Sequence, residues 1–413
     1  MGYYEPTNLQ KSLNDLNPSI AGKADPKSGK LYTEIIEEST GLRVGDNLLP
    51  SNMHWPLSNE EWQVLKNLHG QHFEARIAKL ETYIKATNGQ TTALAQMMRH
   101  VPSNQFDELL ERVDKLSSQV QSTFFDYCVE HVDLVKGLGK RPGLVDQIVN
   151  DQIYLDRFRI ISQSGIDAQK WDDPIFAITD INKHDMTLLS SKMGGKLPMN
   201  ASIFEELVMT NYLASRRPFL KDDAFGVSEE GFKILISKLH QYSRKIGLPK
   251  EGELLTKIQP GGWYSRFIDK NGKFIKGVNA GDYNSVAGFV GRGEYFEPKS
   301  IRQIMEEFRL DYNGTPYDIT DDFYVVIKFK NDDPSKLRFT YDVEGNMHPK
   351  HSPMCNTGFA GSKSSLKPEY EFKKGISREY KEGDILEFRS EISGQLMVKY
   401  KFNYIENSWE IIK

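Results

Sequence analysis

The hydrophobic pattern of this 413-residue chain changes near Leu248-Pro249, and that change limits the folds open to it. Before this point apolar residues recur every three to four positions, as in amphipathic helices, and Trp62 and Leu65 begin one such series. After it, short β-branched and aromatic runs such as 323–329 are typical of strands. We therefore predict a multidomain protein, with an α-helical bundle region at the N-terminal side followed by a small α+β domain of mostly antiparallel strands.

Three segments follow from the same pattern. Residues 1–57 are rich in Asn, Pro, Gly and Ser, and we predict an irregular leader there. Residues 58–250 form the predicted helical bundle region, and residues 258–413 form the predicted α+β domain. We expect chemistry in the α+β domain, because functional residues gather on loops held by a rigid scaffold.

Individual elements can be predicted within these segments. Long helices are expected from a capping box at Ser58 and Glu61 to about Asn88, from Ser103 through Phe124, and from Leu144 to Ser162, with shorter helices at 202–216, 228–246 and 298–308. Strands are expected at 323–329, 337–343, 385–389, 395–404 and 409–412. Ser393-Gly394 and Asn407-Ser408 resemble hairpin turns, so the last three strands are expected to form an antiparallel meander.

Charge and composition exclude several classes of function. The 53 basic and 57 acidic residues give a net charge of −4, so we expect no nucleic-acid partner. No apolar run is long enough for a membrane span, and no signal peptide is readable at the N-terminus. Cys128 and Cys355 are too few for a disulfide framework. We expect a protein that is cytoplasmic in the cell producing it, and that leaves, if it is exported, by a route independent of a signal peptide.

Familiar catalytic and metal motifs are absent. The sequence has no phosphate-binding loop of the GxxxxGK[ST] type, no HExxH, no GxSxG and no CxxC. The glycine-rich segment 288–293 is not embedded in a βαβ unit, which argues against a dinucleotide-binding loop of the Rossmann type. His348, His351 and Cys355 lie close together but lack a fourth ligand, so no metal is expected.

The most informative stretch is a Gly- and Ser-rich loop, 358–365, that leads into a strand carrying Glu369 and Glu371. Alternate residues of a strand share one face, so the two carboxylates point the same way and Tyr370 points the other way. Two neighbouring carboxylates repel, which raises the pKa of at least one. Such a pair can stabilise positive charge that develops on a glycosidic carbon, or it can lie harmlessly on a solvent-facing edge strand.

Two arginines lie in aromatic and glycine-rich contexts upstream. Arg266 follows Tyr264, and Arg292 stands between two glycines shortly before Tyr295 and Phe296. A planar guanidinium suits a diphosphate, and the aromatic rings suit a nicotinamide or an adenine. Each arginine can equally form a surface ion pair.

These residues resemble a known pattern. Arg266, the serines Ser362, Ser364 and Ser365, and the Glu369–Glu371 pair are similar, in this order, to the Arg–Ser–Glu pattern of bacterial ADP-ribosyltransferase toxins. The segment of about 260–372 also resembles NAD glycohydrolases of the tuberculosis necrotizing toxin type, and the whole layout resembles polymorphic bacterial effectors. The Ser-Thr-Ser signature is absent, the serine loop lies unusually close to Glu369, and Glu369 stands where the glycohydrolases have Gln.

The resemblance implies an enzyme that cleaves the nicotinamide–ribose bond of NAD, with NAD as substrate and no metal. It implies that Arg266 holds the diphosphate or ribose, that Glu371 stabilises the oxocarbenium-like transition state, and that Glu369 orients the acceptor, which is water or a protein side chain. The expected substrate-binding residues are Arg292, Ser364, Ser365, Tyr264, Tyr295 and Phe296.

The same resemblance implies a protein target in a host or competitor cell and a cognate immunity or secretion partner. It also predicts that Glu371→Gln abolishes NAD cleavage without unfolding the protein. The alternative is a non-catalytic interaction protein, with a helical region that binds a partner and a β-rich recognition domain.

Overall fold

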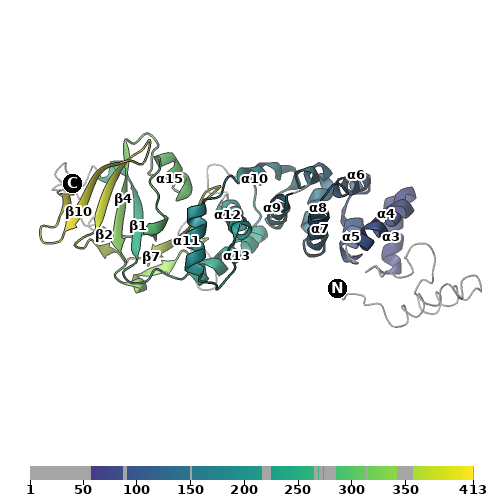
Figure 1. Ribbon diagram of the computed structural model, residues 1–413, viewed down its shortest axis with the longest axis horizontal. Helices are drawn as coiled ribbons and strands as arrows, with labels where there is room; N and C mark the ends of the chain where they lie inside the picture. The colour runs from purple at the N-terminus through teal and green to yellow at the C-terminus, as the bar shows by residue number, and fades with distance from the viewer. Residues whose placement is uncertain are drawn as a thin grey trace, which may run out of the picture. The chain divides into compact units, whose positions relative to one another are not determined.

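The computed structural model describes residues 57–86, 91–148, 151–215, 225–264, 268, 273, 285–311, 315–341 and 357–412. Contacts divide the chain into two compact units, Met1–Ser162 and Gln163–Lys413 (Figure 1), and each unit is described by itself. The predicted leader lies outside the described residues, apart from its last residue, Leu57.

The first unit is helical in all the elements described. Its helices are α3 (Asn59–His69), α4 (Phe73–Ala86), α5 (Thr91–His100), α6 (Ser103–Val113), α7 (Ser118–Glu130), α8 (Val132–Lys140) and α9 (Gln152–Gln163), with 3-10 turns η1 (Gly70–His72) and η2 (Pro142–Gln147). Ser58 begins α3 with the predicted capping box, in which the Glu61 amide donates to Ser58 Oγ at 3.2 Å and the Ser58 amide donates to Glu61 Oε2 at 2.8 Å.

The helices of this unit are shorter than the predicted ones. Gly70 takes φ of 54°, which α-helical geometry does not allow, so the first long helix is divided into α3 and α4. The second is divided between Val113 and Ser118, and the third begins only at Gln152, after η2. Apolar periodicity continues across each break, because the pieces on both sides bury apolar residues.

The second unit begins with further helices. They are η3 (Ala168–Lys170), α10 (Asp172–Ala177), α11 (Lys183–Met193), α12 (Ala201–Ser215) and α13 (Glu229–Ile246). Ser228 caps α13 as predicted, since its hydroxyl accepts from the Gly231 amide at 2.9 Å. No described helix in either unit combines the length and the apolar character that crossing a bilayer requires.

A long antiparallel sheet forms the rest of the second unit (Figure 1). Its strands are β1 (Leu254–Pro260), β3 (Phe289–Arg292), β4 (Phe323–Lys330), β5 (Leu337–Phe339), β6 (Phe359–Gly361), β7 (Leu366–Phe372), β9 (Ile385–Ser390), β10 (Leu396–Asn403) and β11 (Ser408–Ile411). They are ordered β11-β10-β9-β4-β1-β3-β7-β5, and β6 also pairs with β7. Two short strands, β2 (Ser285–Val286) and β8 (Arg378–Glu379), form a separate pair.

The predicted fold class is confirmed, because a helical region precedes an α+β region in which every described strand pair is antiparallel. The predicted meander is confirmed as β9-β10-β11. The expected helix at 298–308 is the shorter α15 (Ile301–Glu307), which Ser300 begins with a capping box. The turn α14 (Gly261–Tyr264) and the 3-10 turns η5 (Gly293–Tyr295) and η6 (Pro334–Lys336) complete the described elements.

Each face of the sheet has its own core. On one face Leu255 of β1 packs in a cluster with Val325 and Ile327 of β4. On the other face Ile258 packs with Tyr324 and with residues of α15, the helix that covers this side. Burying one such side chain contributes roughly 1.5–3 kcal/mol to stability. A shift of β1 or β4 by one residue would move these side chains to the other face, so their alternation determines which residues face each core.

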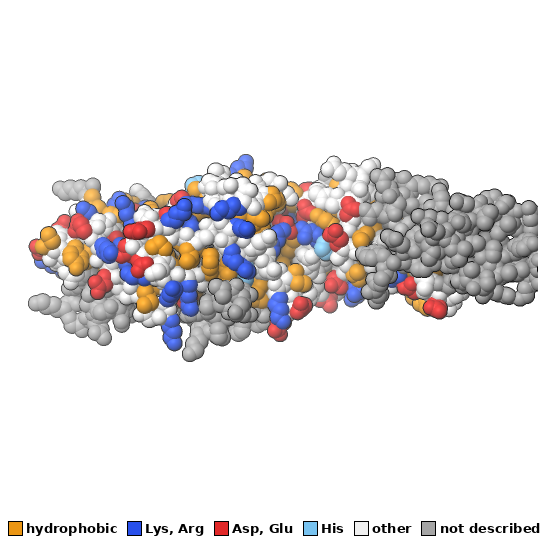
Figure 2. All heavy atoms as spheres, turned by 90° about the horizontal axis from the view of Figure 1, so that it is seen from below, with side chains coloured by type: hydrophobic (Ala, Val, Ile, Leu, Met, Phe, Trp, Pro, Cys, Tyr) orange, Lys and Arg blue, Asp and Glu red, His pale blue; other side chains and the backbone are white. Residues whose placement is uncertain are grey.

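Helices α11 and α12 pack against the sheet at β7, α12 also packs at β6, and α13 packs on α11 and α12 (Figure 1). Thr357 donates to Asn211 of α12 at 2.7 Å, and the Tyr341 ring stacks on His240 of α13 with centroids 3.6 Å apart. These helices therefore belong to one compact unit with the sheet, whereas the predicted domains place them with the bundle region and divide the chain near residue 250. On the face drawn in Figure 2, basic and acidic side chains are interspersed.

Candidate functional site

Strands β1 and β3 separate after a short stretch of pairing. Leu255 pairs with Arg292 and Thr256 with Gly291, and beyond this point β1 continues with β4 alone while β3 continues with β7. A cavity of about 440 Å³ lies where the two strands part. Small-molecule sites in proteins typically measure about 300–1,000 Å³, so the opening is large enough for a ligand.

The walls of this cavity combine rings with a few polar groups. The rings come from Trp263, Phe289, Phe308 and Tyr317, and the polar side chains come from Thr256, Lys257, Gln259, Ser285 and Glu369. Gly291 lies directly opposite Glu369 and adds no side chain, so the carboxyl group faces open space rather than a neighbour. This is the composition expected of a ligand site, with apolar surface for affinity and polar groups for orientation.

Glu369 is the acidic group of the cavity. It is partly buried, and desolvation, followed by repulsion from Glu371, raises its pKa to about 8, although Lys257 and Arg309 act in the opposite direction. In the described part of the chain its carboxyl group accepts no hydrogen bond and forms no ion pair. A carboxyl group without a protein partner in a cavity is available to a ligand.

Lys257 is the basic group of the cavity. Burial lowers its pKa to about 8, and the charge of Glu369 opposes this shift. Its Nζ donates one hydrogen bond, to the Phe289 carbonyl at 3.1 Å, and thus spans the opening between β1 and β3. No ion pair within 4.0 Å joins Lys257 to Glu369 among the described residues, so the amine and the carboxyl group act on each other without direct contact.

Glu371 is placed differently from Glu369. It shares the face predicted for the pair, but it is 4% exposed and accepts from Arg338 of β5, at 2.8 Å from Nη2 and 3.1 Å from Nε. It does not belong to the cavity walls. The ion pair with Arg338 holds Glu371 in place, and the charge of Glu371 raises the pKa of Glu369.

Arg292, Tyr295 and Phe296, which the sequence suggested for substrate binding, are all interior residues. Arg292 is 3% exposed and donates to Tyr370 Oη and to the Gly247 carbonyl, both at 3.0 Å, and to Glu253. Tyr295 is 1% exposed and Phe296 packs in the core beneath α15. Their contacts join α13 and α15 to the sheet, and none of the three lines the cavity.

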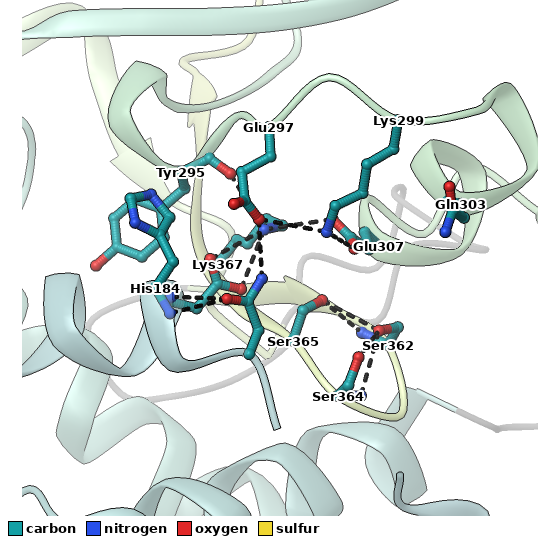
Figure 3. Close-up of polar contacts among 12 residues, drawn as sticks. His184, Tyr295, Glu297, Lys299, Gln303, Glu307, Ser362, Ser364, Ser365 and Lys367 are labelled. Atoms are coloured by element: carbon teal, nitrogen blue, oxygen red, sulfur yellow. Dashed lines mark hydrogen bonds and ion pairs between the residues drawn. The ribbon is translucent and has the colours of Figure 1, made fainter. Parts of the chain in front are cut away.

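Ser364 and Ser365 lie in the turn between β6 and β7, away from the cavity walls. Ser365 is fully buried and its hydroxyl lies 3.1 Å from that of Ser362 (Figure 3). The Ser364 carbonyl accepts from the Asn182 amide at 2.7 Å. The serine loop therefore attaches the sheet to the start of α11.

Next to this loop lies a buried charged cluster that the sequence did not reveal (Figure 3). Lys367 of β7 is 1% exposed and donates to both carboxylate oxygens of Asp185 on α11 at 3.0 Å, as well as to the Tyr295 carbonyl at 3.1 Å. Glu307 of α15 lies 3.4 Å from the same amine, and Lys299 donates to Glu307. Burial raises the pKa of Asp185 to about 6, against the effect of Lys367.

Several residues that the sequence suggested for the site lie outside the described part of the chain. Arg266 and the side chain of Tyr264 lie outside the described residues, as do His348, His351 and Cys355. Among the residues that are described, no group of three or more His, Cys, Asp or Glu side chains has the arrangement of a metal site.

Sequence reasoning also missed Lys257 and Thr256. Their segment, Leu254-Leu-Thr-Lys-Ile-Gln-Pro260, has the alternation of a strand, and a lysine inside such a strand is an unusual polar residue that could have been noticed.

Comparison of the chain with protein-family models, curated proteins and solved structures found no match in any of the three.

Proposed function

We propose that the cavity between β1 and β3 is the active site of an enzyme that cleaves the nicotinamide–ribose bond of NAD, with water or a protein side chain as acceptor. The observation that carries the proposal is Glu369, whose carboxyl group has no hydrogen-bond or ion-pair partner among the described residues and lies on the wall of a ring-lined cavity. The sequence resemblance supplies the substrate class, and the geometry supports Glu369, rather than Glu371, as the group at the reacting centre.

The chemistry follows from charge. When the nicotinamide leaves, positive charge develops on the ribose carbon, and an ionised carboxylate nearby stabilises it. Burial keeps the free Glu369 carboxyl protonated at neutral pH, since its pKa is raised to about 8. A bound cationic nicotinamide ring favours the ionised form, so the substrate itself would help to generate the carboxylate that its cleavage requires.

The remaining walls suit the substrate. Trp263 is 39% exposed at the cavity, and Phe289, Phe308 and Tyr317 add further ring surface against which a flat heterocycle can pack. Glu371, fixed by Arg338, contributes negative potential without entering the cavity. Its proposed role is therefore to raise the pKa of Glu369 through its charge, without contacting the substrate.

The direct test is to incubate the purified full-length protein with NAD and to measure free nicotinamide. We expect release that depends on enzyme concentration, and analysis of the products for free ADP-ribose or modified protein identifies the acceptor. If no nicotinamide appears with either water or added protein extract as acceptor, the catalytic proposal is wrong and the non-catalytic recognition role is favoured.

A steric variant tests whether this cavity is the site. A Cβ at Gly291 would meet only Phe308 Cε1 at 3.8 Å and the Pro368 carbonyl at 3.9 Å, both ordinary contact distances. Gly291→Val is thus expected to fold, to fill space opposite Glu369, and to reduce kcat/KM for NAD by at least tenfold, mainly through KM.

The matched control for this variant is Gly291→Ala, which adds a single methyl group and should have a smaller effect. Circular dichroism checks that both variants remain folded. Unchanged kinetics in a folded Gly291→Val protein would place the reaction elsewhere.

A further inference from the structure

Two polar groups of the cavity, on Thr256 and Lys257, keep hydrogen-bonding capacity that the described residues do not use. Thr256 is 3% exposed, yet its hydroxyl has no hydrogen-bond partner among the residues that the structure describes. The Lys257 ammonium has three N–H donors and uses one of them, on the Phe289 carbonyl. Buried polar groups normally find partners, so a hydroxyl and two ammonium donors left over in one cavity indicate a polar ligand.

The position of Lys257 favours an anionic group on that ligand. Its amine lies 3.6 Å from the point where a Cβ would stand on Gly288, which itself has φ of 71°. Because Gly288 has no side chain, a ligand can approach the amine and the backbone of this turn together. This part of the glycine-rich segment thus lies at the cavity without being a Rossmann loop.

A second cation lies close by. Arg309, between Phe308 and Leu310 of the cavity wall, is 8% exposed. Its three guanidinium nitrogens have no hydrogen-bond partner in the part of the chain that the structure describes, and Asp311 Oδ1 lies 3.7 Å from Nη2. The positive charge of Arg309 acts to lower the pKa of Glu369. Lys257 and Arg309 therefore supply positive charge that can favour an anionic group at their end of the cavity.

We infer that the ligand of this cavity carries a phosphate-class anion, and that Lys257 binds it directly, with Thr256 as a hydrogen-bonding neighbour. The inference rests on the proposed function in that the same cavity is occupied, and it deepens it by assigning the diphosphate end of the dinucleotide to β1. Glu369, which makes no ion pair with this amine among the described residues, then acts on the ribose side of the ligand.

The experiment is calorimetric titration of the full-length protein with inorganic pyrophosphate, ADP-ribose and uncharged adenosine. We expect wild-type protein to bind pyrophosphate and ADP-ribose, and Lys257→Met to weaken both about tenfold to a hundredfold, the usual loss for a charge-assisted hydrogen bond. Lys257→Arg should keep most of the affinity. Lys330→Met removes an exposed lysine at the end of β4 and serves as the control.

The outcomes separate this inference from the proposed function. Equal pyrophosphate affinity in folded Lys257→Met and wild type, or binding of adenosine without pyrophosphate, would overturn it, even if NAD is cleaved. Lys257-dependent binding of pyrophosphate supports it, even if no nicotinamide is released, in which case the proposed cleavage of NAD is wrong and the anion site remains.

Discussion

Replacement of Glu369 by glutamine is expected to remove nicotinamide release while making the protein more stable at neutral pH. Loss of one electrostatic contact with the transition state costs roughly a hundredfold to a thousandfold in kcat. The gain in stability has a different origin, because the fold buries this carboxyl group without giving it a hydrogen bond in the described part of the chain. Glutamine has nearly the same shape and carries no charge to desolvate.

The pH dependence of this gain has a definite sign. In the folded protein the pKa of Glu369 is raised from 4.5 to about 8, so between these values the folded state holds a proton that the unfolded state has lost. Wild-type stability contributed by Glu369 therefore falls as the pH rises from 4.5 to 8. The variant does not titrate there, so its advantage in Tm should grow from pH 5 to pH 8.

At pH 8 the expected advantage is about 1–3 kcal/mol, reduced from the full linkage value because Glu369 retains some solvent contact. Lys257 is present in both proteins, and its pKa is lowered to about 8. Its titration therefore changes the stability mainly above pH 8, outside the range compared here. Thermal unfolding at pH 5, 6, 7 and 8 measures the trend. An advantage that is absent or shrinks toward pH 8 would contradict the burial of an unpartnered carboxyl group.

Glu371→Gln is the matched comparison. It breaks the ion pair with Arg338 and removes a like charge from Glu369, so we expect lower stability, a lower Glu369 pKa and turnover within about tenfold of wild type. Glu406→Gln, at an exposed turn, should change neither property. If Glu371→Gln abolishes turnover and Glu369→Gln does not, the role that the sequence resemblance gave to Glu371 is correct.

Replacement of Lys367 by methionine is expected to cost about 3–5 kcal/mol of stability in the second unit. The change leaves Asp185, which is fully buried, and Glu307 without the amine between them. For a unit of this size each kcal/mol corresponds to roughly 2–4 °C, so Tm should fall by roughly 6–20 °C. Thermal unfolding followed by circular dichroism at pH 7 measures the change.

Two companion variants identify the cause. Asp185→Asn combined with Lys367→Met removes one uncompensated charge, so the double variant should be more stable than Lys367→Met alone. Lys373→Met, just past the end of β7 and exposed, should leave Tm within about 2 °C. A fall of similar size in both lysine variants would show that burial of the Asp185 charge is not the reason.

Local signals explain how much of the fold was predictable. Ser58 and Ser228 begin helices as predicted, because a capping side chain bonds to amides within three residues of itself. The meander at the C-terminal end was predictable for the same reason, since Gly394 and Asn407 take the positive φ angles that hairpin turns need. Interactions of this kind depend only on residues that are close together in the sequence.

The candidate site was only partly predictable. The alternation that places Glu369 and Glu371 on one face is a property of any strand, but their different surroundings depend on β5 and β3, the neighbours of β7. Arg338 is opposite Glu371 and Gly291 is opposite Glu369. Arg292 shows the same limit, because its partners at Gly247 and Tyr370 are far away in the sequence.

The amino-acid sequence by itself determined where the chain changes from helices to strands, which residues begin several helices, and which residues of a strand share a face, because these depend on periodicity and on contacts between near neighbours. Only the tertiary structure decided which carboxylate acquires a partner and which faces a cavity, since strand order and the parting of β1 from β3 bring together groups that no local pattern connects.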